Sequence, residues 1–186
     1  MLKEAIKESF IGIVTDYLSY LQGELISEGY MIRGAITAGD ICISGDIVFG
    51  PALIEAVEGE KKAVFPRIIL LPRAVELYQI QWNMTDPIFD LCEDSDGLVF
   101  LDYLEATVMI AYPDDRAFTE FLDGSKQCIS DNLGKYANNV HIRAKYEWAA
   151  SYHNAFCKRY TDMFCPQYLI EVEKLVQPPK RWLIKK

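Results

Sequence analysis

The sequence predicts a mixed α/β fold in which helices pack against a sheet of short strands. Patterns along residues 3–71 occur in the order helix, strand, strand, helix, strand, which is typical of an α/β layer. The chain of 186 residues is 51% apolar and 12% aromatic, enough to build a sizeable core. One domain is the default expectation, and two remain possible.

Residues 3–28 form the first predicted element, a helix of about seven turns. Apolar side chains recur there at spacings of three and four, so they share one stripe. Gly29 is well placed to end the helix. The stripe consists of Ile6, Phe10, Ile13, Val14, Tyr17, Leu18, Leu21 and Leu25.

Residues 30–50 are rich in β-branched and aromatic side chains and are interrupted at 39–40 and 45–46. This pattern predicts two strands joined by a loop, in the manner of a hairpin. Pro51 then opens a helix over 51–63, since proline is tolerated in a first helical turn. A strand follows over 65–71.

The remaining elements are a short helix at 73–82, an extended segment at 97–104, and two helices near 114–134 and 139–160. The tail 177–186 contains two prolines and several basic residues, so we expect a surface extension. The predicted division is residues 1–160, of which 113–160 are helical, and a C-terminal extension over 161–186.

Charge is distributed unevenly along the chain. Nineteen basic and 27 acidic residues give a net charge of −8, which disfavours binding to nucleic acid or to an anionic membrane. Between residues 86 and 131, twelve acids face two bases, a net of −10, so the rest sums to +2. An anionic ligand is therefore expected on the N-terminal half or on the C-terminal helices.

Within that acidic segment, residues 90–97 superficially suggest a calcium loop. The run lacks spaced oxygen ligands and a closing glutamate, so a solvated turn is favoured. His141 and His153 have no metal-ligand spacing, and a structural or solvent-exposed role is favoured for both.

Five widely spaced cysteines without a C-x-x-C pair fit reduced thiols in a cytoplasmic protein. Charges interrupt the N-terminal apolar run too early for a signal peptide, and no apolar stretch approaches 18 residues. We therefore expect a cytoplasmic location and no membrane span.

The strongest local pattern is R-G-A-I-T-A-G at 33–39, followed by F-G-P-A-L-I-E-A at 49–56 and F-P-R-I at 65–68. Its glycines and prolines lie at the ends of predicted elements, where backbone can approach a ligand closely. Tight turns alone also explain them, and on the residues alone that interpretation is favoured.

Together with K-Y-E-W-A-A-S-Y-H-N-A-F at 145–156, these motifs resemble the class III adenylate and guanylate cyclase family. The likeness covers about residues 2–156, the C-terminal part of that family's domain, in the branch of antiphage pyrimidine cyclases. The resemblance implies a ferredoxin-like palm sheet with packed helices, whose N-terminal strands are missing here, and a helical C-terminal part.

The resemblance also implies which residues face a nucleoside triphosphate. Base choice in the family is set near Asp46, which could accept a hydrogen bond from an exocyclic amine. The family's transition-state asparagine and arginine fall on Ile54 and Glu58, so Arg67 is the candidate catalytic cation. Pairing of Arg67 with Glu58 or Glu60 is an equally favoured alternative. The implied nucleotide-binding residues are Arg33, Gly34, Gly39, Asp46, Phe49 and Gly50.

The family uses Mg²⁺ or Mn²⁺ held by two aspartates on strands that precede the R-G-A-I strand. Neither motif is present, and the acids before Arg33 all lie on the predicted first helix: Glu4, Glu8, Asp16, Glu24 and Glu28. No metal ligand is therefore assigned. The resemblance implies a homodimer, or a partner that carries the metal-binding half.

Two functions follow as hypotheses. The first is a nucleotide cyclase that makes a 3′,5′-cyclic mononucleotide, pyrimidine products included, in antiphage signalling, and that is inactive alone. The second is a non-catalytic pseudo-cyclase module for binding or dimerisation. For the aromatic segment 145–156, helix packing is favoured over base stacking.

Overall fold

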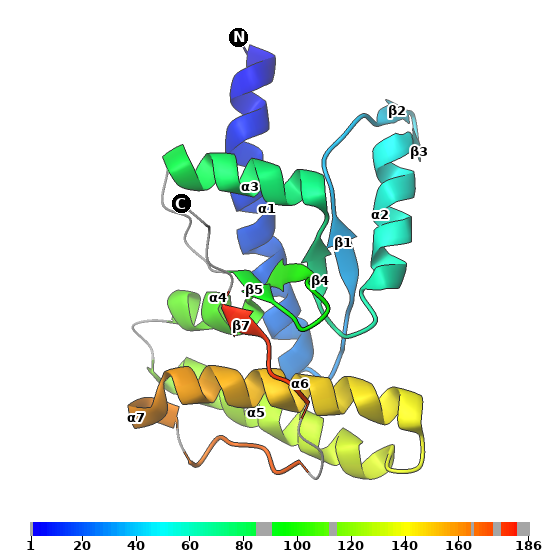
Figure 1. Cartoon of the computed structure of the whole chain (residues 1–186). Helices are drawn as coiled ribbons and strands as arrows, with labels where there is room; N and C mark the ends of the chain where they lie inside the picture. The colour runs from blue at the N-terminus through cyan, green and yellow to red at the C-terminus, as the bar shows by residue number, and fades with distance from the viewer. Residues whose placement is uncertain (1, 85–90, 112–114, 165, 173–175, 182–186) are drawn as a thin grey trace.

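The computed structural model describes residues 2–84, 91–111, 115–164, 166–172 and 176–181 (Figure 1). Its helices are α1 (Leu2–Ser27), α2 (Pro51–Lys62), α3 (Pro72–Met84), α4 (Tyr103–Ala111), α5 (Asp115–Lys135), α6 (Val140–Arg159) and α7 (Thr161–Phe164). Its strands are β1 (Gly34–Ile36), β2 (Cys42–Ser44), β3 (Ile47–Phe49), β4 (Ile68–Leu70), β5 (Leu91–Glu93), β6 (Val99–Leu101) and β7 (Lys180–Arg181). The mixed α/β class is confirmed.

Five strands form the main sheet in the order β1-β4-β6-β5-β7. β1 and β4 are parallel, with Gly34 opposite Ile68, and the other neighbours are antiparallel. A separate hairpin, β2–β3, projects from the region that joins β1 to α2 (Figure 1). The two strands predicted over 30–50 are three in the structure: β1 joins the main sheet, and β2 and β3 form the hairpin.

The N-terminal helix α1 ends where the sequence predicts. Gly29 has φ +88°, and the amides of Gly29 and Tyr30 donate to the carbonyls of Ile26 and Leu25. This is the hydrogen-bond pattern of a Schellman motif with glycine in the left-handed position.

The stripe on α1 that we expected to be buried is covered only in part. Leu18 packs against the core and Val14 and Leu25 are half-buried, while Ile6 and Phe10 lie outside the side chains that the structure describes. Ile13, Tyr17 and Leu21 of the predicted stripe are 64%, 72% and 39% exposed.

The inward face carries the buried Ile11 and Ile26 together with small and polar residues. Here α1 approaches its neighbours closely, because a Cβ on Gly23 would lie 2.3 Å from the Thr107 hydroxyl oxygen of α4. The buried small and polar residues on this face are Gly12, Thr15, Ser19, Gln22 and Gly23.

The C-terminal helices form the other layer. α5 and α6 run side by side below the sheet in Figure 1 and contact each other. Trp148, Tyr152 and Phe156 of α6 are at most 1% exposed in the main core. Trp148 and Tyr152 pack on Phe100 of β6, and Phe156 packs on Phe118 of α5. The expectation that the aromatic segment 145–156 serves helix packing is confirmed.

Three elements escaped the sequence-based expectations. β5 and α4 flank the predicted strand at 97–104, and only residues 99–101 of that segment are strand. The tail is more than a surface extension, because Lys180 and Arg181 pair with β5 at the sheet edge. Before them, Tyr168 and Ile170 are buried against α6, where Asn154 and the Ile170 backbone exchange two hydrogen bonds.

Candidate functional site

The junction of the hairpin with α2 brings two predicted nucleotide-binding glycines together. Gly50 has φ +144°, and a Cβ there would lie 2.6 Å from the carbonyl oxygen of Asp40. A Cβ on Gly39 would lie 3.2 Å from the Cβ of Ala52. Gly50 therefore requires a residue without a side chain, on steric and on conformational grounds, while a side chain at Gly39 would need Ala52 to shift by a few tenths of an ångström.

The first turn of α2 offers little free backbone to an anion. Pro51 has no amide hydrogen, the Ala52 amide donates to Asp40 at 3.4 Å, and the Ile54 amide donates to Gly50 at 3.3 Å. Within the described residues, the Leu53 amide is the one in this turn for which no backbone acceptor is found. Tight binding of a phosphate here would need side chains.

Phe49 and Asp46 lie on the hairpin beyond this junction. Phe49 is 53% exposed and lies opposite Cys42. Gly45 and Asp46 form the two-residue loop of the hairpin, and Asp46 is its second residue. Gly45 has φ +58°, and glycine at the first loop position is the preference of type II′ turns. An aromatic ring and a carboxylate are thus both open to a ligand.

Arg33 and Gly34 lie at the opposite end of α2. The Nε atom of Arg33 is 2.5 Å from a carboxylate oxygen of Glu60, in the last turn of the helix. Ten residues separate Glu60 from Gly50, which corresponds to about 15 Å along a helix axis. One phosphate group cannot touch both ends, so the predicted nucleotide-binding residues fall into two separate groups rather than one.

Arg67, the predicted catalytic cation, is fully buried at 0% exposure. It forms ion pairs with Asp94, at 2.5 Å, and with Asp96. The alternative pairing with Glu58 or Glu60 is wrong, because the guanidinium turns into the core, away from α2. There it lies within 6 Å of three aromatic ring centroids, those of Phe65, Phe100 and Trp148.

Asp94 joins this cation to the helical layer. The indole nitrogen of Trp148 donates to Asp94 at 2.6 Å, and the Trp148 ring stacks on Phe65 at 5.5 Å. We expected the acidic run at 90–97 to be a solvated turn, and this expectation is wrong for its described residues. Asp94 is 6% exposed, and Asp96 forms an ion pair with Arg67. No local sequence pattern predicted that Arg67, just before β4, would contact Asp94 and Asp96 in a turn far along the chain.

A second buried polar cluster surrounds Asp102, which is 0% exposed. Asp102 accepts hydrogen bonds from Tyr152, from Cys92 at 3.2 Å and from Arg159 at 2.8 Å. It also accepts from the Glu105 amide in the first turn of α4, at 3.4 Å. The cluster ties β5, α4 and α6 together.

Glu105 extends this cluster toward the surface. It accepts a hydrogen bond from the Tyr160 hydroxyl and lies 3.7 Å from Arg159. Burial raises the pKa of Glu105, and Arg159 and the Tyr160 hydrogen bond oppose that rise. Burial, with the nearby Asp102 carboxylate as a smaller cause, therefore favours a protonated Glu105 more than solvent would.

His153 behaves as a structural residue, as expected. It is 1% exposed, its Nε2 lies 3.0 Å from the Tyr168 carbonyl oxygen, and its Nδ1 lies 3.4 Å from the Ser125 hydroxyl. Burial lowers its pKa to about 4. His141 is exposed at the start of α6.

The described residues do not fit a divalent metal ion. Among them, no group of three or more histidine, cysteine, aspartate or glutamate side chains could hold one. Asp16 is half-buried on α1, and burial raises its pKa to about 6, which disfavours the charged form that a cation needs. Neither Mg²⁺ nor Mn²⁺ is therefore assigned to a side chain within the described part of the chain.

Comparisons with known proteins give no match. Family models, curated proteins and solved structures were all compared with the chain without a similarity. Among the described helices, none is both long and apolar enough to cross a membrane. A functional assignment therefore depends on the motifs and on the geometry above.

Proposed function

We propose that this chain supplies the nucleotide-facing part of a class III cyclase-like protein with a ferredoxin-like palm. Support comes from the order of the three N-terminal motifs and from their adjacency. β1 pairs with β4, and α2 joins the hairpin to them. The single observation that carries the proposal is the junction at Gly39 and Gly50, where the motif glycines meet below an exposed hairpin.

In this proposal the hairpin reads the base and Arg33 faces phosphate. The exposed ring of Phe49 offers a stacking surface, and Asp46 offers an acceptor for an exocyclic amine. Arg33 is 41% exposed and held by a surface ion pair, which costs little to break. The two subsites match a ligand with a base at one end and phosphates at the other.

The proposed reaction is an intramolecular phosphoryl transfer. The 3′-hydroxyl oxygen bonds to the α-phosphorus, the bond to pyrophosphate breaks, and the hydroxyl proton leaves to a base. The metal-binding carboxylates of such a reaction would come from a second chain, since the described residues do not provide them. The catalytic role expected for Arg67 stays a prediction, and it requires the guanidinium to leave Asp94 and Asp96.

Nucleotide binding is the first test. Calorimetry of the full chain with each of the four nucleoside triphosphates and Mn²⁺ should show binding, and Phe49→Ala should weaken it about tenfold by loss of stacking. Val48→Ala is the matched control, because Val48 is 45% exposed on the same strand and outside the predicted set. No binding by any nucleotide, or equal losses in both variants, would contradict the proposal.

Product formation is the second test. Cyclic mononucleotide and pyrophosphate should appear only after addition of a chain that carries the metal-binding carboxylates. Cyclic product from this chain alone would show that the expected dependence on a partner is wrong.

A non-catalytic module is the second candidate function. The specific observation in its favour is the amount of apolar surface on α1 and on the hairpin, which is typical of a binding surface. Association with another chain in the absence of nucleotide binding would favour this candidate over the cyclase.

A further inference from the structure

The segment that follows α7 lies along α6 and ends at the edge of the main sheet. There β7 is the outermost strand, next to β5 and above α6 in the view of Figure 1. The described residues of this segment, 166–172 and 176–181, contain no helix or strand besides β7. The two described parts are held to the rest of the chain in different ways.

The first part, residues 166–172, is held firmly. Tyr168 and Ile170 are 7% and 4% exposed. Asn154 and the backbone of Ile170 exchange two hydrogen bonds of 2.8 Å, and Nε2 of His153 lies 3.0 Å from the Tyr168 carbonyl oxygen. This part of the segment is therefore anchored on α6.

The second part, residues 176–181, is held by fewer contacts. Pro179 is buried, but none of the described side chains at 176–180 forms a hydrogen bond or an ion pair. Pro178 and Pro179 have no amide hydrogen, so they cannot donate to a neighbouring strand. The pairing of the two residues of β7 with β5 thus supplies most of the attachment.

Within the described residues, the pairing of β5 with β7 includes a single hydrogen-bonded pair. The amide of Asp94 donates at 3.1 Å to the carbonyl of the residue before β6, so it points toward β6. Hydrogen-bonded and non-hydrogen-bonded pairs alternate along antiparallel strands, so the backbone groups of Glu93 point the other way, toward Lys180. Cys92 and Arg181 then form the non-hydrogen-bonded pair. A strand held in this way leaves the sheet at a small cost in free energy.

The neighbouring strand β5 does not depend on β7 for its place. It pairs with β6 over three residues, and its Leu91 and Cys92 are both 2% exposed. Departure of β7 would therefore open the edge of a fixed strand rather than unfold it. An open edge offers backbone donors and acceptors to any extended segment that can pair with it.

Charge determines which segment fits this edge. Glu93 is exposed and lies opposite Lys180, and opposite charges that face each other across two strands attract. Asp96, in the turn that follows β5, is 42% exposed. Residues 177–186 contain four basic residues and no acidic residue, whereas residues 86–131 carry a net charge of −10. The edge therefore favours a basic peptide segment and repels nucleic acid.

We propose that the edge of β5 binds an extended segment of another protein that carries lysine or arginine, and that β7 occupies this site in the free chain. The segment adds to the sheet as a strand, with its backbone paired to Glu93 and a basic side chain opposite the carboxylate. Binding exchanges the chain's own β7 for the segment of the partner.

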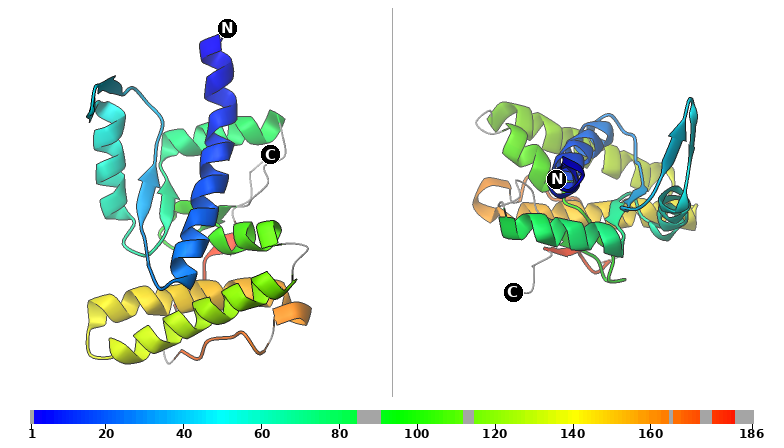
Figure 2. Two further views of the ribbon diagram at one scale, coloured as in Figure 1. Left: turned by 180° about the vertical axis from the view of Figure 1, so that it is seen from behind. Right: turned by 90° about the horizontal axis from the view of Figure 1, so that it is seen from above.

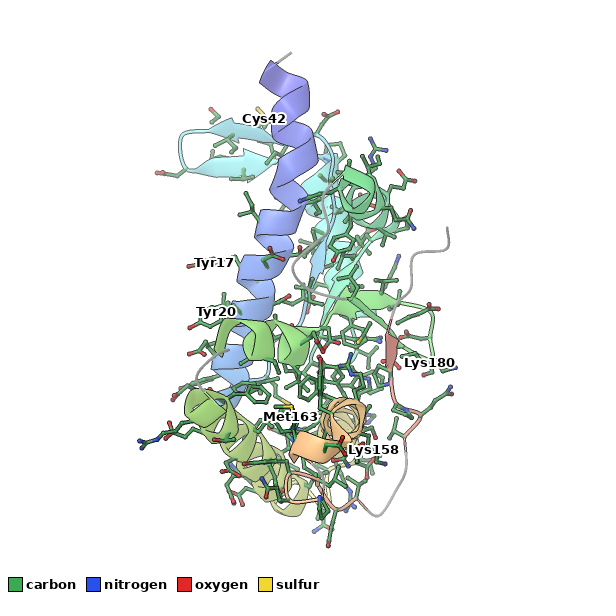
Figure 3. All side chains as sticks on the ribbon, turned by 90° about the vertical axis from the view of Figure 1, so that its left-hand side faces the viewer. Tyr17, Tyr20, Cys42, Lys158, Met163 and Lys180 are labelled. Carbon is green, nitrogen blue, oxygen red and sulfur yellow. The ribbon has the colours of Figure 1, made fainter. Side chains whose placement is uncertain are left out.

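This site is separate from the residues of the proposed nucleotide site. β1 and β7 are at opposite edges of the sheet, and both views of Figure 2 show β7 apart from the β2–β3 hairpin. Lys180 lies on the side of the molecule opposite to that from which Tyr17 and Tyr20 project (Figure 3). The tests use no nucleotide, so their outcome does not depend on the cyclase proposal.

A peptide with the sequence of residues 177–186 is the probe for binding. The fluorescence anisotropy of the labelled peptide should rise when the full chain is added, because the peptide competes with β7. Lys180→Glu in the chain places a like charge opposite Glu93 and should raise its affinity for the peptide about fivefold. The same substitution in the peptide should instead lower its affinity for the natural chain about fivefold.

Reversal of the charge on β5 tests the position of the peptide. Glu93→Lys should reverse the preference, so that the peptide with Lys180→Glu binds more tightly than the natural peptide. Glu120→Lys is the matched control, because it makes the same change of charge at a side chain that is 66% exposed on α5, and it should keep the natural preference. The same preference in both variants would overturn the proposal, since the attraction would then be non-specific.

Hydrogen exchange followed by NMR tests the displacement of β7. The Glu93 amide should exchange about fivefold faster in the Lys180→Glu chain than in the natural chain, and saturating peptide should restore its protection. The Asp94 amide, which does not point toward β7, is the internal control and should stay protected throughout. The proposal would be overturned by absence of peptide binding to both chains, or by a Glu93 amide that responds to neither the substitution nor the peptide.

Discussion

Two regions of this molecule differ in which side chains they bury: one buries charged side chains, and the other leaves apolar side chains exposed to solvent. Around the sheet and α6, Arg67, Asp94 and Asp102 are at most 6% exposed, and each is paired. Around α1 and the hairpin, Tyr17 and Ile43 are 72% and 66% exposed. The difference teaches that burial follows the presence of a partner: charges are buried where a counter-charge meets them, and apolar groups stay outside where nothing covers them.

The largest effect on stability is expected at Arg67, and it tests whether the buried charges depend on their partners. Arg67→Ala should lower the free energy of unfolding by about 3–5 kcal/mol, because Asp94 would be left buried and unpaired. Urea denaturation followed by tryptophan fluorescence measures the loss.

A matched control for Arg67 is Arg73→Ala. Arg73 pairs with Glu76, but both side chains are about 60% exposed, so that variant should lose less than about 1 kcal/mol. Similar losses in the two variants would show that the buried pair contributes no more than a surface pair. An inactive Arg67→Ala variant would indicate a catalytic role only if it remained folded.

His153 gives the next largest effect, as a dependence on pH. Its pKa is lowered from 6.5 to about 4, so between these values the unfolded chain binds a proton that the folded chain excludes. Stability from this group is complete above pH 6.5 and is lost as pH falls toward 4. Between pH 7 and pH 5 the loss should be about 2 kcal/mol, since one pKa unit corresponds to about 1.4 kcal/mol.

Urea denaturation at the two pH values measures that loss, with His153→Gln as the comparison. Glutamine cannot titrate, so the pH dependence of the variant should be smaller by the same amount. An equal pH dependence in both proteins would assign the effect to other groups.

The smallest effect on stability is expected at the exposed apolar side chains of α1 and the hairpin, and it sharpens the comparison. Tyr17→Ser and Ile43→Ser remove exposed side chains, so each should change the free energy of unfolding of the single chain by no more than about 0.5 kcal/mol. Urea denaturation at low protein concentration measures this. A large loss would show that these side chains pack within their own chain.

Local sequence patterns predicted most helices and three of the strands, but not which side of α1 is buried. The helix bounds follow from spacing and from Gly29, whereas the buried side is set by the close approach that Gly12 and Gly23 allow. On the buried side, Ile11 and Ile26 lie among small and polar residues that carry no hydrophobic signal, so periodicity selected the more apolar side instead. The covered side of a helix is a tertiary property.

The site was predictable to the same limited extent. Gly39 and Gly50 were expected at element ends, and the structure brings them together. Arg33 was expected with them, yet it lies at the other end of α2 beside Glu60. The partners of Arg67 are 27 and 29 residues away along the chain, and no local pattern indicates so distant a pairing.

The contact between Trp148 and Asp94, which are 54 residues apart, also determines when the chain can complete its folding during synthesis. A ribosome will have completed β1, β4, β5 and β6 well before it makes α6, so during that interval Arg67 and Asp94 lack the indole ring and the helix that cover them. Contacts of such long range form late and slow folding. The emerging polypeptide therefore stays open until α6 has left the exit tunnel, and cutting it ahead of α5 should yield two pieces that cannot fold separately.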